Sequence, residues 1–393
     1  MAKAIATIGM FMLFLVSSCT RPDSTVVPES HKAKDVGAGT DPGGSWTVFR
    51  GDSGLSGSTN QTLPESPKLL WTVETGGEIR STPVTDGRAV VFGSFDGNVY
   101  AVDAVTGKEI WKHETEFPIE AAPLIYGDKV FVGSMGGLLI AIDLKSGEEE
   151  WTYETEGRIA GAANTYVDAS GSLVLVGSYD GKLHAVHSAS GKLAWTAETE
   201  YFINGAPAIG DGTVIFGGCD AFLHVVSAAS GEKTGAVDTG AYVAASAVFM
   251  DGKAYVGNYD DAVVCADVES REILWTFKTG VEGTAFYSSP AVAEGVVVIG
   301  SRDGNLYALD AVNGQALWIF STGAGVDASP VIAKDMVLVG SLDGNLYMLS
   351  LDDGTEHWAY EIGAGIATSA AVAGGRFFLG AEDGFLYAFG ENT

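Results

Sequence analysis

Residues Ala101–Trp111 read Ala-Val-Asp-Ala-Val-Thr-Gly-Lys-Glu-Ile-Trp, and close relatives of this phrase recur along most of the chain. The phrase begins with alternating apolar and polar residues, which is the pattern of a half-buried strand. It turns at Thr106-Gly107, where glycine accepts the backbone conformation of a tight turn, and enters a second strand. That strand contains Trp111, a bulky side chain that can dock on a neighbouring repeat. The phrase therefore predicts the joint between two structural units.

A second anchor, Gly-Ser-x-Asp-Gly, fixes the length and the number of the repeats. It occurs eight times, with variations, at separations of 40, 44, 40, 40, 43, 40 and 40 residues. Such a period is typical of propeller blades with four strands each. The eight copies begin at Gly93, Gly133, Gly177, Gly217, Gly257, Gly300, Gly340 and Gly380.

One repeat divides into four strands, because alternating apolar positions and glycine-bearing turns favour strands over helices. In the first repeat these are residues 81–84, 89–94, 98–103 and 109–115. The last copy, residues 367–389, stops after its third strand, whereas a strand at residues 69–75 has no partner before it. We predict that residues 69–75 complete the C-terminal blade and close the ring. The expected fold is an all-β, eight-bladed propeller of four-stranded antiparallel blades.

Tryptophan fills seven of the eight docking positions of the repeat, which indicates packing between blades rather than a cofactor signature. These positions are Trp71, Trp111, Trp151, Trp195, Trp275, Trp318 and Trp358. The eighth position is Gly235, and Arg271 replaces the turn glycine of the next phrase. Two interpretations remain open: drift in a redundant array, or a site opened for a partner.

Composition excludes several classes of function. The chain has 393 residues, with 22 basic and 50 acidic side chains and a net charge of −28, so its surface repels nucleic-acid phosphates. The six histidines are scattered, and one Asp for each Gly-Ser-x-Asp-Gly turn does not supply the oxygens that calcium needs. We therefore expect no nucleic-acid partner and no metal site. Three cysteines do not make a disulfide framework.

The N-terminus has the layout of an export signal. A single Lys3 precedes an apolar run over residues 4–16, and Ser17-Ser18 stand directly before Cys19. Val-Ser-Ser-Cys resembles a bacterial lipobox, which implies cleavage before Cys19, lipid attachment to Cys19 and sorting to the outer membrane. An ordinary secretory peptide or a membrane anchor are the alternatives, although the apolar run is short for a membrane span. We expect a signal peptide at 1–18, a flexible tether at 19–45 and one propeller domain at 46–393.

The repeated Ala-x-Asp-x-x-Thr-Gly-x-x-x-Trp phrase, counted in eight units, resembles the pyrroloquinoline-quinone-like (PQQ-like) β-propeller superfamily over residues 46–393. The opening Trp46-x-x-Phe49-Arg50-Gly51 is also similar to the starts of such chains. The resemblance implies one of two functions. One branch contains quinoprotein dehydrogenases, and the other contains non-catalytic propellers such as the lipoprotein BamB of the outer-membrane β-barrel assembly machinery. The length, the lipobox and the lack of extra domains look more like the BamB branch.

The dehydrogenase branch implies a cofactor on the propeller axis. Glu120 and Asn204, two blades apart, resemble the Glu and Asn with which those enzymes hold calcium beside the quinone. The following blade carries Ala244 where they place a catalytic Asp, and no two cysteines are adjacent. A base must reach the proton that it removes. We therefore expect no enzyme and no cofactor, with PQQ and calcium as the alternative.

Aromatic and charged residues gather in the segments that enter the innermost strands. If the repeats align, these side chains ring one mouth of the central channel and form a partly apolar, partly acidic funnel, as expected of a recognition surface. The alternative is that the aromatic residues plug the channel or pack between blades. The candidate funnel residues are Arg80, Phe117, Glu120, Tyr201, Phe202, Asn204, Tyr242, Phe286, Tyr287 and Asp327.

These features together predict a non-enzymatic scaffold that a lipid tethers in the bacterial cell envelope, on the outer membrane facing the periplasm. We expect a monomeric propeller that contacts the membrane only through its N-terminal lipid and binds a protein partner, in outer-membrane protein assembly. The alternatives are a PQQ- or carbohydrate-dependent periplasmic or secreted enzyme, and a sugar- or peptide-binding module.

Overall fold

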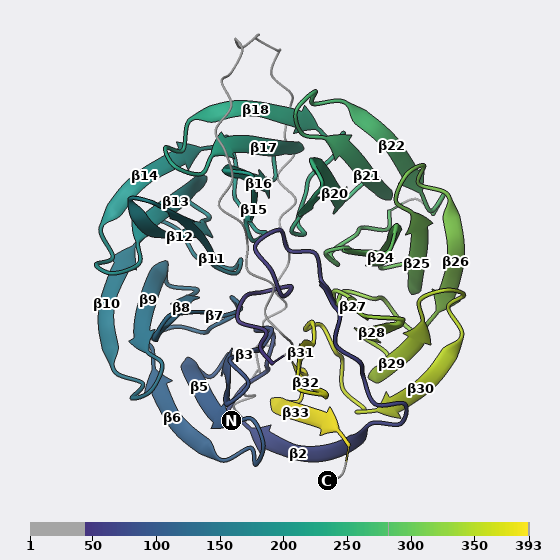
Figure 1. Ribbon diagram of the computed structural model, residues 1–393, viewed down its shortest axis with the longest axis horizontal. Coiled ribbons are helices and arrows are strands. Elements are labelled where there is room, and N and C mark those ends of the chain that lie inside the picture. The colour runs from purple at the N-terminus through teal and green to yellow at the C-terminus, as the bar shows by residue number, and fades with distance from the viewer. Residues whose placement is uncertain (1–43, 282, 392–393) are drawn as a thin grey trace, which may run out of the picture. The chain divides into compact units, whose positions relative to one another are not determined.

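The computed structural model describes residues 44–281 and 283–391. They form eight sheets of four antiparallel strands, arranged as blades around a central axis, which confirms the predicted eight-bladed propeller (Figure 1). The predicted export signal, Cys19 and the tether as far as residue 43 lie outside the described residues. Within the part that the structure describes, no helix is long and apolar enough to cross a membrane.

The strands follow one order in every blade, from the axis outward. Blade one contains β3 (Val84–Thr85), β4 (Ala89–Gly93), β5 (Asn98–Asp103) and β6 (Glu109–Glu114), and blade two contains β7 (Leu124–Tyr126), β8 (Lys129–Gly133), β9 (Leu138–Asp143) and β10 (Glu149–Glu154). Blade three contains β11 (Asn164–Asp168), β12 (Gly171–Gly177), β13 (Lys182–His187) and β14 (Leu193–Glu198). Blade four contains β15 (Ala208–Gly210), β16 (Thr213–Gly217), β17 (Phe222–Ser227) and β18 (Lys233–Asp238). Blade five contains β19 (Val248–Met250), β20 (Lys253–Gly257), β21 (Ala262–Asp267) and β22 (Ile273–Lys278). Blade six contains β23 (Ala291–Ala293), β24 (Val296–Gly300), β25 (Asn305–Asp310) and β26 (Ala316–Ser321). Blade seven contains β27 (Val331–Ala333), β28 (Met336–Gly340), β29 (Asn345–Ser350) and β30 (Glu356–Glu361). Blade eight contains β31 (Ala371–Ala373), β32 (Arg376–Gly380), β33 (Phe385–Gly390) and β2 (Lys68–Glu74), and β1 (Ser58–Thr59) lies parallel to β27.

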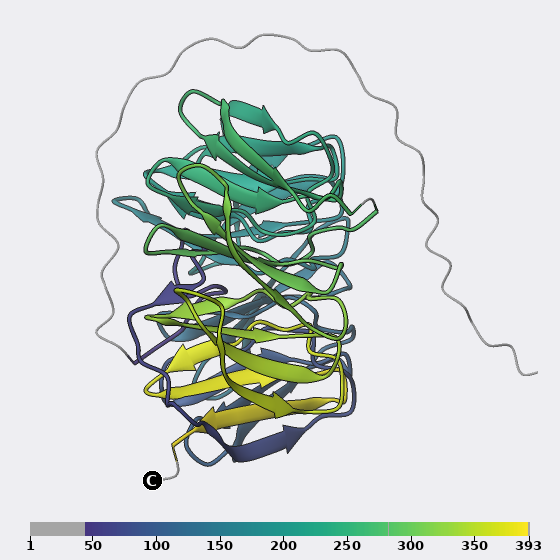
Figure 2. The same ribbon diagram turned by 90° about the vertical axis from the view of Figure 1, so that its right-hand side faces the viewer.

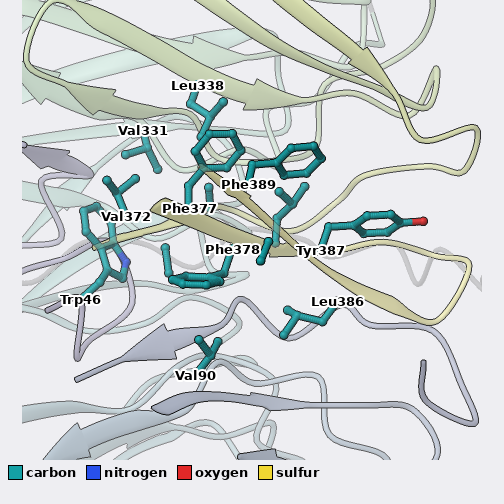
Figure 3. Packing of buried hydrophobic residues seen from close by; sticks show 14 of the residues in the cluster. Trp46, Val90, Val331, Leu338, Val372, Phe377, Phe378, Leu386, Tyr387 and Phe389 are labelled. Atoms are coloured by element: carbon teal, nitrogen blue, oxygen red, sulfur yellow. The ribbon is translucent and has the colours of Figure 1, made fainter. Parts of the chain in front are cut away.

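The ring closes as predicted, through the strand at the start of the propeller. β2 runs antiparallel to β33, with Trp71 opposite Ala388 and Glu74 opposite Phe385. Figure 1 shows the two strands side by side, one purple and one yellow. Buried aromatic residues fill this last blade: the rings of Phe377 and Phe389 stack with centroids 5.2 Å apart (Figure 3). The blade therefore depends on residues from both ends of the propeller.

The innermost strand of the first blade is shorter than predicted. We expected a strand over residues 81–84, whereas β3 begins only at Val84. Near the axis, the Ser81 hydroxyl donates to the Ala121 carbonyl of the next blade at 2.9 Å, and Pro83 has no N–H to donate to a sheet. The Ser81 hydroxyl also accepts from the Gly93 N–H of its own blade at 3.1 Å, so a side chain takes the place of strand pairing there.

The repeated Thr-Gly turn and the repeated tryptophan are two halves of one joint. A Cβ atom on Gly147 of blade two would lie 2.7 Å from the Trp111 ring of blade one, so only glycine leaves room for the indole. The Trp111 Nε1 also donates to the Leu144 carbonyl of blade two at 2.8 Å. Gly107 meets Trp71 in the same way, and Gly354 meets Trp318. At six of the eight joints, one blade thus supplies a ring and the next blade a glycine.

The joint between blades four and five reverses this arrangement. Gly235 stands where other blades have tryptophan, and the Arg271 side chain of blade five lies over it and donates to the Thr234 carbonyl. Arg271 itself adopts a φ of 64°, the conformation of the glycine that it replaces. The two departures from the repeat therefore compensate each other, and the interpretation of a site opened for a partner has no support in this packing.

A segment that we call the strap, residues 46–61, crosses the middle of the ring on one face (Figures 1 and 2). It forms hydrogen bonds of 2.7–3.1 Å with all eight blades in turn. The blade residues that bond to it are Thr85, Ile125, Asn164, Ile209, Phe249, Val292, Ile332 and Val372. The strap therefore closes one mouth of the central channel.

Arg50 anchors the strap inside the channel. Its side chain is fully buried and donates to the Ser369 hydroxyl at 2.8 Å and to the Pro290 carbonyl at 2.9 Å. Burial lowers the pKa of Arg50 to about 9, an effect that the nearby Asp52 opposes, so the guanidinium stays charged at neutral pH. Gly57 passes directly beside this guanidinium, where any side chain would collide with it.

The aspartate of the Gly-Ser-x-Asp-Gly anchor holds its turn, as the sequence suggested, and also binds the aromatic residue four positions on. Asp343 accepts from the Asn345 N–H at 2.8 Å, from the Tyr347 hydroxyl at 2.8 Å and from the Gly323 N–H of the preceding blade at 2.7 Å. Asp96, Asp303 and Asp383 bind Tyr100, Tyr307 and Tyr387 in the same way. His184 and His224 take the tyrosine's place in blades three and four.

These carboxylates predict a loss of stability in acid. Burial raises the pKa of Asp343, but the hydrogen bonds from Gly323, Asn345 and Tyr347 outweigh it and hold the pKa below 3.8. A lowered folded pKa stabilises the fold above the unfolded value and loses that effect as the pH falls through the folded value. Tyr347→Phe should therefore cost about 1 kcal/mol at neutral pH, and less below pH 3. Urea unfolding of both proteins across this range measures the difference; a constant difference would contradict the assignment.

Candidate functional site

The open mouth of the channel is a cavity of about 210 Å³, which we call the funnel. Phe49 of the strap lines it, as do the eight residues that the repeat alignment places at one position of each blade. These are Arg80, Glu120, Ala160, Asn204, Ala244, Tyr287, Asp327 and Ala367. The mouth opposite the strap therefore offers a concave surface on the propeller axis.

One backbone hydrogen bond, repeated in every blade, sets the wall of the funnel. The variable residue of each Gly-Ser-x-Asp-Gly turn donates its N–H to a backbone carbonyl. That carbonyl belongs to the residue two positions before the inner position, which is the residue of each blade that lines the funnel. Tyr179 donates to Arg158, Tyr259 to Tyr242 and Arg302 to Ala285, at 2.9, 2.9 and 3.3 Å. The turn residue of one blade thus stands beside the loop that enters the axis, and both contribute side chains to the rim.

Hydroxyl groups join the blades beneath the funnel on one side of the axis. The Ser246 N–H donates to the Ser289 hydroxyl at 3.0 Å, the Ser289 N–H donates to the Ser329 hydroxyl at 2.9 Å, and the Ser369 N–H donates to the Thr82 hydroxyl at 3.1 Å. The equivalent residues of blades two to four are alanines, which pack with Leu55 of the strap. The floor is polar on one side and apolar on the other.

Two of the three charged residues on the funnel wall are neutralised by neighbours. Arg302 donates to both carboxylate oxygens of Asp327, through Nε to Oδ1 at 2.9 Å and through Nη2 to Oδ2 at 2.7 Å, and hydrogen bonding to Asp327 raises the pKa of Arg302. Arg80 pairs with Glu78 at 2.9 Å and Glu382 at 3.3 Å. Despite the net charge of −28, Glu120 is the one charged residue of the wall for which the described chain shows no ion pair, so the wall is not an open acidic field.

The rim carries a series of aromatic and cationic contacts over blades three to six. Tyr179 lies between the Arg158 guanidinium, 3.8 Å from its ring centroid, and the Phe202 ring, stacked at 4.9 Å. Farther round, Tyr259 meets the edge of Tyr287 at 5.0 Å, and the Arg302 guanidinium covers Tyr287 at 3.7 Å. Burial, and then the hydrogen bond with Tyr287, raises the pKa of Tyr259. Aromatic rings that such contacts hold in place present apolar surface to a partner, and binding then costs little side-chain entropy.

The structure sorts the ten candidate funnel residues into three groups. Arg80, Glu120, Asn204, Tyr287 and Asp327 line the funnel. Phe117, Phe202 and Tyr242 are 41%, 49% and 37% exposed, and Tyr201 is half-buried; none of these four reaches the cavity itself.

Phe286 is a wrong assignment. It is fully buried and packs between blades five and six against Tyr307 and beneath Gly257, where a side chain would collide with it. Its neighbour Tyr287 takes the inward position because successive residues of an extended segment point to opposite sides. The alternative reading, that some of the aromatic residues pack between blades, therefore holds for this residue.

Two sets of site residues were not predicted from the sequence. The variable residue of the Gly-Ser-x-Asp-Gly turn supplies Tyr179, Tyr259 and Arg302 to the rim, and aligning the eight copies at this position would have shown that aromatic and cationic residues gather there. Phe49 was not placed in the funnel, because the segment that begins at Trp46 occurs once and has no repeat to align with.

The residues of the funnel do not fit a calcium–quinone pair. Glu120 and Asn204 line the same cavity, but the described residues contain no group of three His, Cys, Asp or Glu side chains that could hold a metal. Ala244 presents a methyl group where the dehydrogenase branch needs a carboxylate. Cys219 and Cys265 are far apart in the sequence, so the described chain has no adjacent pair of cysteines. We therefore derive no reaction through this cofactor.

Solved structures that share this fold include both branches. BamB from Moraxella catarrhalis matches with a TM-score of 0.68 and 18% identity, over 83% of this chain and all of that one. Quinohemoprotein alcohol dehydrogenase from Comamonas testosteroni matches with a TM-score of 0.74 and 12% identity, over 89% of this chain and 81% of that one. The computationally designed Ika8 protein matches with a TM-score of 0.72 and 17% identity, over 82% of this chain and all of that one. At these identities the likeness shows the fold alone.

Comparison with protein-family models distinguishes the two branches better than similarity to solved structures does. No curated protein sequence matches the chain. The model of one protein family, described as outer membrane protein assembly factor BamB, matches residues 61–209, 160–234, 220–378 and 321–393, which together span the repeats. With eight blades, a strand-closed ring and this match over most of its length, the chain belongs to the BamB family of outer-membrane assembly factor propellers.

Proposed function

We propose that this protein is a non-enzymatic scaffold, exported and tethered by a lipid on Cys19 to the outer membrane facing the periplasm, that binds a protein partner during outer-membrane protein assembly. The observation that carries the proposal is the gathering of exposed aromatic rings at one mouth of the propeller. Family membership supports the role in assembly. The lipobox-like sequence supports the tether.

The exposed rings favour a protein partner over a small molecule. Phe202, Tyr242 and Tyr259 are 49%, 37% and 37% exposed and stand on the rim, above a cavity whose charged residues are mostly paired. Tyrosine, phenylalanine and arginine are the residues that dominate protein interfaces, and rigid placement lowers the entropy cost of using them. A rim of this kind suits a broad contact better than a deep small-ligand site.

The strap explains how such a rim stays in place without a ligand. Because residues 46–61 bond to every blade on the opposite face, the ring cannot open at the axis when a partner pulls on the rim. The proposed mechanism is geometric: a rigid ring holds side chains from adjacent blades at fixed positions for a partner to contact. No bond is made or broken.

Replacing two rim residues tests this proposal. Phe202→Ala combined with Tyr242→Ala should weaken capture of the envelope partner by about 30-fold or more for each side chain removed, because central aromatic residues contribute about 2 kcal/mol or more each. The matched control is Leu193→Ala with Ile110→Ala, which removes similarly exposed apolar side chains from outer strands of other blades. Affinity capture from solubilised envelopes measures the difference, and equal capture by both variants would refute the use of this rim.

A further inference from the structure

Glu120 differs from every other shielded carboxylate of the described chain. It is half-buried on the funnel wall, and it takes part in no hydrogen bond and no ion pair with residues 44–281 or 283–391. All other buried or half-buried aspartates and glutamates of those residues accept a hydrogen bond or form an ion pair. A carboxylate that is partly withdrawn from water without a partner is unfavourable, so a partner from outside the chain would stabilise it.

No cation of the described funnel or rim forms an ion pair with Glu120. The arginines that pair on the funnel wall have other carboxylates as partners. Arg158 lies over the Tyr179 ring, 3.8 Å from its centroid, and forms no ion pair within the described chain. Burial raises the pKa of Tyr179 and the charge of Glu120 adds to this effect, whereas Arg158 opposes it, so both charged groups lie near Tyr179. The negative charge of Glu120 is therefore left for a partner.

Apolar groups share the funnel with Glu120. Ala160 lines the cavity at the equivalent position of the next blade, and Phe49 lines it from the strap. Lysine and arginine side chains bury their apolar stems against such surfaces while the charged head binds a carboxylate. Asn204, also on the wall, donates its amide N–H to the Cys219 Sγ at 3.4 Å, which leaves its amide oxygen as a second acceptor. The funnel thus combines apolar surface with two groups that accept hydrogen bonds from a cation.

The size and the surroundings of the funnel favour a single side chain as its occupant. Its volume of about 210 Å³ lies below the range of about 300–1,000 Å³ that is typical of small-molecule sites. Phe202 and Tyr242 are exposed on the rim around it. In protein interfaces, the strongest contacts have this form: a central pocket takes one anchor residue, and the residues around it exclude water.

We propose that the funnel receives a lysine or arginine side chain of the protein partner, and that the cationic head of this side chain pairs with Glu120. This inference rests on the proposed function, because it names the group that a partner on the rim inserts. A chain with a net charge of −28 also attracts a basic segment before contact is made. A metal ion fits less well, since the described residues contain no group of three His, Cys, Asp or Glu side chains that could hold one.

Glu120→Gln isolates the charge from the fold. Because Glu120 forms no hydrogen bond and no ion pair within the described chain, the variant should keep the melting temperature of the parent protein. Glu116→Gln is the matched control, since it removes the same charge from the same loop at an exposed position four residues earlier. The melting temperatures of both variants are measured first.

Binding of defined peptides to the full chain in detergent, followed by ligand-observed NMR, tests the proposal directly. The probes are acetyl-Gly-Gly-Arg-Gly-Gly-amide, its lysine analogue and its citrulline analogue, which has nearly the shape of arginine but no charge. The parent chain should bind the arginine or the lysine peptide about tenfold or more tightly than the citrulline peptide. This preference should fall at high salt, disappear in Glu120→Gln and persist in Glu116→Gln. Equal binding of the three peptides, no binding up to about 10 mM, or equal loss in both variants would overturn the proposal.

Capture of the envelope partner separates this inference from the proposed function. We expect Glu120→Gln to weaken capture about tenfold or more, in addition to the effect of Phe202→Ala with Tyr242→Ala. If the rim variant weakens capture whereas Glu120→Gln does not, the rim binds its partner without a cation in the funnel, and this inference alone is wrong. If the rim variant leaves capture unchanged, the proposed function is wrong, and the peptide measurements still decide whether the funnel binds a cationic side chain.

Discussion

A chain that begins at residue 76 is expected to lose cooperative unfolding and to aggregate, although every repeat of its sequence is intact. It lacks β2, which completes blade eight, and the strap, which bonds to all eight blades. The contacts removed include the Trp71 ring on Gly107 and the buried side chains of Trp46, Arg50 and Leu55. Their loss exceeds the 5–15 kcal/mol by which a domain is normally stable.

Two controls isolate the cause. A chain that begins at residue 44 should unfold like the full protein, because it keeps every described contact. A chain in which residues 44–75 are moved behind residue 391 through a flexible linker should recover a cooperative transition, since β2 then reaches β33 from the other end. Thermal unfolding followed by near-ultraviolet circular dichroism distinguishes them. A cooperative transition in the chain that begins at residue 76 would show that the closing strand and the strap are dispensable.

The reversed joint between blades four and five gives the second large effect. Gly235→Trp alone should cost about 1–3 kcal/mol, because the new side chain collides with the Arg271 guanidinium. Arg271→Gly alone should change stability little, since it removes a side chain but relieves a φ of 64°. The double variant recreates the Trp–Gly joint found elsewhere in the ring, so it should recover the loss and be at least as stable as the parent chain.

The interaction free energy between the two substitutions shows whether Gly235 and Arg271 compensate each other. Urea unfolding of the parent, the two single variants and the double variant should give an interaction free energy of about 2 kcal/mol in favour of the pair. Additive effects would mean that Gly235 and Arg271 departed from the repeat independently, as drift in a redundant array implies.

The repeats made most of this fold predictable from the sequence. Eight copies of one pattern average out local ambiguity, so the number of blades, the closing strand at β2 and the role of Trp111 all followed from periodicity. The pairing of Gly235 with Arg271 did not follow, because the two residues lie in different copies, and only packing shows that the ring of one blade faces the turn of the next. The strap was missed for the related reason that it occurs once.

The site could be predicted in part for the same reason. Glu120, Asn204 and Asp327 were placed on the funnel wall by aligning equivalent positions, which fixes where a residue lies along the strand. That alignment does not fix which of two successive aromatic residues points inward, and so Phe286 was assigned to the funnel in place of a position between blades. The contacts of Tyr179 with Phe202 and of Arg302 with Asp327 join two neighbouring blades and have no signal in one copy alone.

Different parts of the chain form the ring and select the partner. The repeated phrase, with its tryptophan and its glycine, makes a uniform ring, and residues that recur in every blade cannot select a partner. Selection falls to positions that vary between copies, such as the inner funnel residue and the turn residue beside it. Apart from Phe95 of blade one, the aromatic ones lie together over blades three to six, and this concentration is the basis for proposing a protein-binding rim.

Photo-crosslinking in living cells tests that central proposal most directly. The lipid-tethered chain would carry a benzophenone side chain at Phe202 on the rim, or at Leu193, an equally exposed position on the outer strand β14. The account predicts that the Phe202 position yields a defined crosslink to an envelope protein and that the Leu193 position does not. A crosslink of equal strength from both positions, or from Leu193 alone, would contradict a partner bound at the funnel.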